Sequence, residues 1–235
     1  MSKMMFCFLL LIPPLAFADK PVVAVDVGHG VRDGGAISAR GRSEFAFNRD
    51  FSERLAGQLE AQRIAVREIN FDGHIDSLVA RPEAASGSDF FVSVHHDSVS
   101  EAYLQAWVWE GRSLTYTDVK KGYGIFVSAA NPFPETSLLC ASAVGAMLRR
   151  AGFEPTPWHG RKHQAADAVN GVWYYDNLVV LYRTTLPALL FEAGVIKHRD
   201  EELLLRDPVR QRRMADALAS GIAACLQVTG KLAPE

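Results

Sequence analysis

Residues 89–98 read DFFVSVHHDS, an apolar run that ends abruptly on two histidines and an aspartate. Phe90, Phe91, Val92 and Val94 predict a buried strand, because β-branched and aromatic side chains pack well on a pleated surface. That packing does not require the histidines that follow. Imidazole binds metal ions and transfers protons, so the end of this strand predicts a chemical site.

Strands and helices are expected to alternate along the rest of the chain. Apolar runs predict further strands at 21–28, 65–69, 122–129 and 187–194. Apolar residues at helical spacing predict helices at 43–62, 81–87, 137–152 and 208–227. We therefore expect a single α/β domain, in which a twisted and mostly parallel sheet is flanked by helices on both faces. Segments 99–121 and 154–175 lack a clear period and are expected to be surface loops, with a short lid as an alternative for the first.

The N-terminus has the features of a secretory signal peptide. Lys3 precedes an apolar stretch at 4–12, and Ala16-Phe17-Ala18 matches the usual cleavage pattern. The apolar stretch is too short for a stable membrane span. We expect residues 1–18 to be removed, and the mature chain of residues 19–235 to be exported to the periplasm or outside the cell.

Charge and cysteine content narrow the functional class. The sequence has 25 basic and 27 acidic residues and no basic tract, which argues against nucleic-acid binding. After removal of the signal peptide only Cys140 and Cys225 remain, and either one disulfide or two buried free thiols fit an exported protein. A cysteine nucleophile is disfavoured, because Cys140 lies in a helical apolar run without an adjacent base.

Candidate ligands gather at one predicted edge of the sheet. His29 and His95 each follow a strand, Glu192 lies at the end of the last strand, and ligands in open α/β sheets bind beyond the carboxyl ends of strands. Glu44 opens the first helix and could return to the same edge. Two imidazoles and a carboxylate form a known catalytic zinc set, and a further carboxylate could act as general base and acid. Taken singly, a histidine after a strand or an acid at a helix start needs no such explanation.

These motifs resemble a known family. VVAVDVGHGVRDGGA (22–36), Glu44, SVHHDS (93–98) and LPALLFEAGVIKHRDEE (186–202) are similar, in order, to the zinc-dependent N-acetylmuramoyl-L-alanine amidases of the amidase-3 type. The resemblance covers nearly all of the mature chain. It implies an amidase catalytic domain at 19–235, peptidoglycan as substrate, Zn²⁺ as cofactor, and an activator protein as a possible partner.

The resemblance also implies residue roles. His29, Glu44 and His95 would be the zinc ligands, and Glu192 the catalytic glutamate. Val27 and Val31 depart from the proline and glycine common in the family. The choice of His95 over its neighbour His96 depends on alignment with the end of the strand. Some relatives carry a long helix that plugs the zinc, and no clean amphipathic helix stands out in 99–121.

Several other polar residues have possible roles beside plainer ones at the surface. Asp26 and Asp97 are candidates to hydrogen-bond the outer nitrogens of the ligand histidines. His159 and His163 could contact substrate, and Arg183 could bind a stem-peptide carboxylate.

Two rival functions stay open on the sequence alone. One is another zinc peptidase of the cell wall, of carboxypeptidase type. The other is a non-catalytic wall-binding or regulatory protein, which would have no use for Glu192 as a general base.

Overall fold

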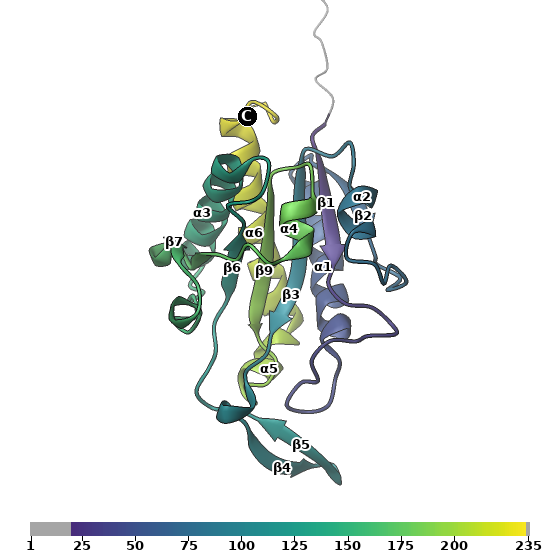
Figure 1. Cartoon of the computed structure of the whole chain (residues 1–235), viewed down its shortest axis with the longest axis vertical. Helices are drawn as coiled ribbons and strands as arrows, with labels where there is room; N and C mark the ends of the chain where they lie inside the picture. The colour runs from purple at the N-terminus through teal and green to yellow at the C-terminus, as the bar shows by residue number, and fades with distance from the viewer. Residues whose placement is uncertain (1–19, 234–235) are drawn as a thin grey trace, which may run out of the picture.

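The computed structural model describes residues 20–233, so the predicted signal peptide lies outside the described residues. The centre of the fold is a seven-stranded sheet with the strand order β2-β1-β3-β9-β6-β8-β7 (Figure 1). The strands are β1 (Val22–Val27), β2 (Ala65–Ile69), β3 (Phe90–Asp97), β6 (Gly124–Val127), β7 (Ala165–Asp167), β8 (Val172–Tyr174) and β9 (Ala188–Val195). The prediction of one α/β domain with a mostly parallel sheet is confirmed.

Strand direction places the carboxyl ends of four strands at one edge. β2, β1, β3 and β9 run parallel to one another. β6 pairs antiparallel with β9, and the next strand β8 runs parallel to β6. β9, the last predicted strand, pairs directly with the central strand β3. The carboxyl ends of these two strands therefore lie side by side.

Helices cover both faces of the sheet, as predicted. α1 (Glu44–Ala61), α3 (Pro134–Arg150) and α6 (Pro208–Val228) share one apolar core with the sheet. The short helix α4 (Val179–Arg183) packs on the opposite face, and α2 (Ala80–Ala84) lies beside β2. α5 (Glu201–Leu205) follows β9. In the described part of the chain, no helix has the length and apolarity needed to cross a membrane.

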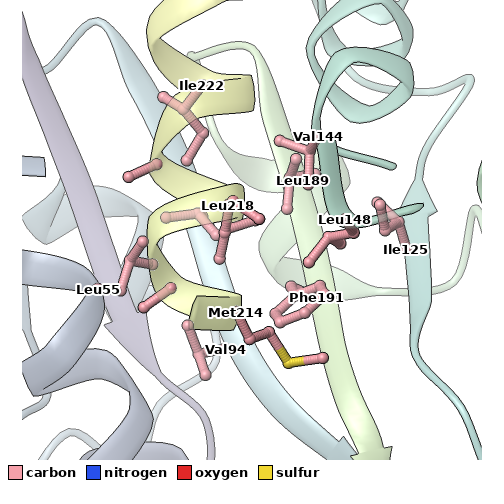
Figure 2. Close-up of a cluster of buried hydrophobic side chains, with 14 of the residues drawn as sticks. Leu55, Val94, Ile125, Val144, Leu148, Leu189, Phe191, Met214, Leu218 and Ile222 are labelled. Carbon is pink, nitrogen blue, oxygen red and sulfur yellow. The ribbon is translucent and has the colours of Figure 1, made fainter. Parts of the chain in front are cut away.

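The larger core explains why the central strands are apolar without alternation. Figure 2 shows Met214 and Leu218 of α6 on the side of the helix that faces Leu189 and Phe191 of β9, and Ile222 belongs to the same core. The opposite face of β3 and β9 packs in a second core. Strands that are covered on both faces carry continuous apolar runs, and this is the pattern seen in the sequence.

The prediction that 154–175 is a surface loop was wrong. β7 and β8 extend the main sheet, and Trp173 of β8 is buried in the second core. Each of these strands has three residues, which is too short for a period to be visible in the sequence. The short helices α4 and α5 were missed for the same reason.

Segment 99–121 also contains regular structure. β4 (Gln105–Trp109) and β5 (Arg112–Tyr116) form a hairpin that extends beyond the main sheet in Figure 1. Its two turn residues, Glu110 and Gly111, both have positive φ, as a type I′ hairpin turn requires. Trp107 donates a hydrogen bond to the carbonyl of Ala39 at 2.9 Å, so the hairpin packs on the loop before α1.

The two remaining cysteines form a disulfide, which resolves the alternatives that the sequence left open. Cys140 of α3 and Cys225 of α6 are bonded with their Cα atoms 5.0 Å apart. The bond closes a long loop, with a sequence separation of 85 residues, and joins two helices that cover the same face.

Removing this disulfide should destabilise the protein without disturbing the site. The Cys140→Ala/Cys225→Ala variant should lose about 2–4 kcal/mol of unfolding free energy, because the unfolded chain is no longer restrained. Chemical denaturation of the variant and of the reduced wild type measures this loss. Equal stability of the oxidised, reduced and variant proteins would contradict the prediction.

Candidate metal centre and catalytic carboxylate

The turn after β1 presents His29 from an unusual backbone conformation. His29 has φ of 65°, in the left-handed region that non-glycine residues seldom adopt. The Asn70 side chain donates hydrogen bonds to the carbonyls of Val27 at 2.8 Å and of His29 at 2.6 Å. Arg81 donates to the same two carbonyls. These contacts hold the strained turn and thereby fix the direction of the imidazole.

Glu44, the first residue of α1, lies between the two histidines. One carboxylate oxygen is 3.1 Å from His29 Nε2, and the other is 3.1 Å from His95 Nδ1. The backbone amide of Ala36 donates to the carboxylate at 3.2 Å. Burial by itself would raise the pKa of Glu44, but the hydrogen bonds and charges of the two histidines outweigh it and hold this pKa well below the ordinary value.

The three side chains fit a metal ion. One ligand atom from each of His29, Glu44 and His95 lies within 4.8 Å of the others. Glycines make room for this cluster, since a Cβ at Gly28 would collide with the His95 ring and one at Gly35 would lie 2.7 Å from the Glu44 carboxylate. Two imidazoles and a carboxylate are also the donor set of many catalytic zinc sites.

The structure distinguishes the two adjacent histidines. His95 contacts Glu44 and lines the cavity beside α4, whereas His96 packs on the other side of β3 against Phe47 and Phe51 of α1. His96 Nδ1 is 2.8 Å from the Asn48 side-chain oxygen. Burial lowers the pKa of His96 to about 3, so this imidazole is a neutral part of the core.

Glu192 lies next to the candidate ligands on the neighbouring strand. It is the register partner of His95 across β3 and β9. Its Oε2 is buried and has no hydrogen-bond partner in the described part of the chain. Burial, followed by the negative charges of Asp97 and Glu44, raises the pKa of Glu192 well above that of an ordinary glutamate. A buried carboxylate of high pKa is suited to accept and return a proton.

Asp97 and His159 extend the polar cluster beyond Glu192. Burial is the main cause that raises the pKa of Asp97 to about 7, and the charge of Glu44 adds to it. His159 Nε2 is 3.6 Å from the Asp97 carboxylate. The second histidine of that loop, His163, packs on Tyr175 with ring centroids 4.3 Å apart.

The predicted partners of the ligand imidazoles lie elsewhere. Asp26 accepts a hydrogen bond from the Ser93 hydroxyl at 2.7 Å and lies 3.6 Å from Arg81. Asp97 faces His159, so neither carboxylate pairs with His29 or His95. Arg183 is exposed at the end of α4.

A cavity of about 560 Å³ opens beside the candidate ligands. Leu178 and Val179 of the α4 region line it, together with Arg32 and Arg81. The sequence did not predict that Asn70 and Arg81 hold the turn after β1. Both side chains bind backbone carbonyls that are distant in the sequence, and no local sequence pattern indicates such a contact.

The fold and site define a class of protein. An open α/β sheet with a candidate metal-binding His-Glu-His cluster and a buried carboxylate at its carboxyl edge is an arrangement suited to a hydrolase. The profile of the N-acetylmuramoyl-L-alanine amidase family, Amidase_3, matches residues 23–224. The chain belongs to this family, and its function is that of a peptidoglycan amidase.

Solved structures of other amidases share the fold. An N-acetylmuramoyl-L-alanine amidase from Clostridium difficile 630 is 21% identical, with a TM-score of 0.71 over 92% of this chain and 100% of that one. The catalytic domain of CwlV from Bacillus (Paenibacillus) polymyxa var. colistinus is 24% identical, with a TM-score of 0.68 over 88% and 99%. The Clostridioides difficile amidase CwlD, solved in complex with the GerS lipoprotein, is 19% identical, with a TM-score of 0.66 over 89% and 100%. No curated protein matches the chain.

Substitution of the two adjacent histidines should have different effects. His95→Ala should lower bound metal, as measured by elemental analysis of the purified protein, because one of three ligands is lost. His96→Ala should retain metal but lose about 2–3 kcal/mol of unfolding free energy, since it removes a buried ring and the partner of the Asn48 side-chain oxygen. Loss of metal from the His96 variant alone would reverse the assignment.

The pH dependence of turnover should reflect the environment of Glu192. A general base must be deprotonated, so activity should fall as pH decreases through the raised pKa of Glu192. Asp97→Asn removes one negative charge that raises this pKa and should move the acid limb of the kcat/KM profile to lower pH. Asp216→Asn, at an exposed position on α6, is the control. An unmoved limb in the Asp97 variant would show that another group sets it.

Proposed function

We propose that the protein is a zinc-dependent amidase that cleaves the amide between the lactyl group of N-acetylmuramic acid and L-alanine of the stem peptide. The observation that carries this proposal is the position of Glu192 beside the His29–Glu44–His95 cluster, at the carboxyl edge of the sheet. Membership of the amidase family supports the choice of substrate.

His29, Glu44 and His95 would hold the ion. Neutral imidazoles and one carboxylate leave a Zn²⁺ site with about one net positive charge, which would offset the negative charge of nearby Asp97 and Glu192. When bound, zinc supplies a Lewis acid that polarises the scissile carbonyl and makes water acidic enough to lose a proton near neutral pH.

Glu192 would move the protons of the reaction. Its buried Oε2 has no partner among residues 20–233 and is therefore free to accept a proton from the attacking water. The raised pKa of Glu192 favours retention of that proton until the leaving nitrogen takes it. Protonation of the nitrogen is essential, because an amide anion is a very poor leaving group.

Location and partners belong to the same proposal. The signal-peptide features of residues 1–18 support export to the periplasm or outside the cell, where peptidoglycan is found. The amidase CwlD was solved in complex with the GerS lipoprotein, which supports a search for a protein partner of this chain, an activator among the candidates.

Glu192→Gln should separate metal binding from catalysis. The variant should keep its metal, because the ligands are unchanged, and lose turnover by a factor of about 10²–10⁴, because the proton acceptor is gone. Digestion of purified peptidoglycan, followed by mass spectrometry, measures turnover and identifies the bond that is cut. Stem peptides with a free N-terminal L-alanine and an intact glycan are the expected products.

The same digestion tests the rival functions. Shortened stem peptides that remain attached to glycan would indicate a carboxypeptidase, and unchanged material would indicate a binding protein. Chelation should abolish digestion and added Zn²⁺ should restore it. Undiminished digestion after chelation would refute the metal-dependent mechanism.

A further inference from the structure

A group of cations and aromatic rings stands beside the catalytic carboxylate. It comprises Tyr103, Lys120, Trp158 and Arg161, and we call it the Trp158 wall. Lys120 Nζ is 3.8 Å from the centre of the Tyr103 ring and 5.0 Å from that of Trp158. Arg161 Cζ is 4.1 Å from the centre of the Trp158 ring. The Trp158 indole N–H donates to the carbonyl of Val119 at 3.1 Å, which fixes the ring that both cations contact.

In the described part of the chain, the positive charges of this wall form no direct salt bridge, although Lys120 is close enough to Asp97 to act on its charge. Among residues 20–233, no carboxylate lies within 4.0 Å of the charged nitrogens of Lys120 or Arg161. Asp118, the acid nearest to Lys120 in sequence, pairs instead with Arg199 at 2.7 Å. Aromatic faces attract cations but do not neutralise them. The wall therefore favours binding of an anion.

The wall continues directly into the catalytic site. His159, which follows Trp158, contacts both Asp97 and the backbone of Gly124. A Cβ at Gly124 would lie 2.5 Å from His159 Nε2, so the imidazole needs a glycine there. Gly124 is the register partner of Glu192 across β6 and β9. A bound substrate that extends from Glu192 toward β6 therefore meets the His159 loop and then the Trp158 wall.

Strand order sets the direction in which the substrate lies. The candidate ligands lie on the β1 and β3 side, Glu192 is on β9, and the wall is beyond it on the β6 side. The scissile carbonyl has to face the ligands, whereas the leaving nitrogen has to reach Glu192. The leaving half of the substrate thus extends toward the wall. The cavity lined by His29 and His95 contains no residue of the wall and is left for the acyl half.

We propose that the Trp158 wall binds the carboxylates of the departing stem peptide, and that the glycan occupies the opposite side of the site. This inference rests on the proposed amidase function, in which the leaving half is a peptide that begins with L-alanine. Lys120 and Arg161 pair with the peptide carboxylates, and Trp158 holds both cations in position. The protein therefore prefers acidic stem peptides to those whose carboxylates are amidated.

Direct binding tests the proposal independently of turnover. The probes are the synthetic tripeptide L-alanyl-γ-D-glutamyl-L-alanine and the same peptide with both carboxylates amidated. Isothermal titration of the wild-type protein should show tighter binding of the acidic form. Lys120→Gln/Arg161→Gln should weaken its binding about tenfold, as expected for the loss of two partly exposed ion pairs, and leave the amidated peptide unaffected.

A charge-matched control isolates the wall. Lys121→Gln/Arg212→Gln removes the same charge from exposed positions outside the wall and should bind both peptides as the wild type does. With acidic muropeptides as substrate, the wall variant should have a raised KM and a kcat within about twofold of wild type, because the groups that react are untouched. Circular dichroism establishes that both variants are folded.

The outcomes separate this inference from the proposed function. Equal binding of the two peptides by the wild type, or equal weakening in both double variants, overturns the role of the wall. Preference for the acidic peptide that the wall variant alone loses supports it. If the wild type fails to release L-alanine-terminated peptides from peptidoglycan, the proposed function fails, whereas the titrations still decide whether the wall binds acidic peptides.

Discussion

The contact of one buried carboxylate with two imidazoles organises the functional part of this protein. Glu44 reaches His29 from the loop side and His95 from the strand side, with the same 3.1 Å separation. His29 follows β1 and His95 lies near the end of the adjacent parallel strand β3, so a single acid at the start of α1 can join the two histidines. Burial makes the contact strong, because a charge removed from water must be matched by nearby donors.

Two further acidic side chains, Asp97 and Glu192, lie near the Glu44 carboxylate. Asp97 and Glu192 are close enough to Glu44 that its negative charge raises the pKa of both carboxyls. Arg81, a buried guanidinium, hydrogen-bonds backbone carbonyls and lies near Asp26. An excess of buried negative charge favours the arrival of a cation, and perturbed carboxyls of this kind are typical of catalytic sites.

The reversal of strand direction at β6 gives the site two unlike sides. On the parallel side, strand ends and the α4 region border a cavity lined by apolar and charged side chains and by two of the candidate ligands. On the other side, β6 runs back along β9 and places Gly124 beside Glu192. The space that glycine leaves is filled by His159, whose loop carries Trp158 and Arg161. An asymmetric substrate, glycan at one end and peptide at the other, therefore meets different chemistry on each side.

Local sequence was sufficient for the main elements and for the membership of the candidate site. Apolar runs and helical spacing act over a few residues, so the central strands, α1 and α6 could be predicted. Because parallel strands end at one edge, His29, His95 and Glu192 could be grouped from their positions in the sequence, and the family resemblance added the role of Glu44.

Other features depended on contacts between residues far apart in the chain. β3 is buried on both faces, so no alternation of polarity shows which of His95 and His96 points toward Glu44. Its pairing with β1 and the position of α1 decided this. The same holds for the disulfide, for Arg81 and Asn70 at the β1 turn, and for the wall beside Glu192. Each is made of side chains whose neighbours come from distant segments, and only the folded chain brings those segments together.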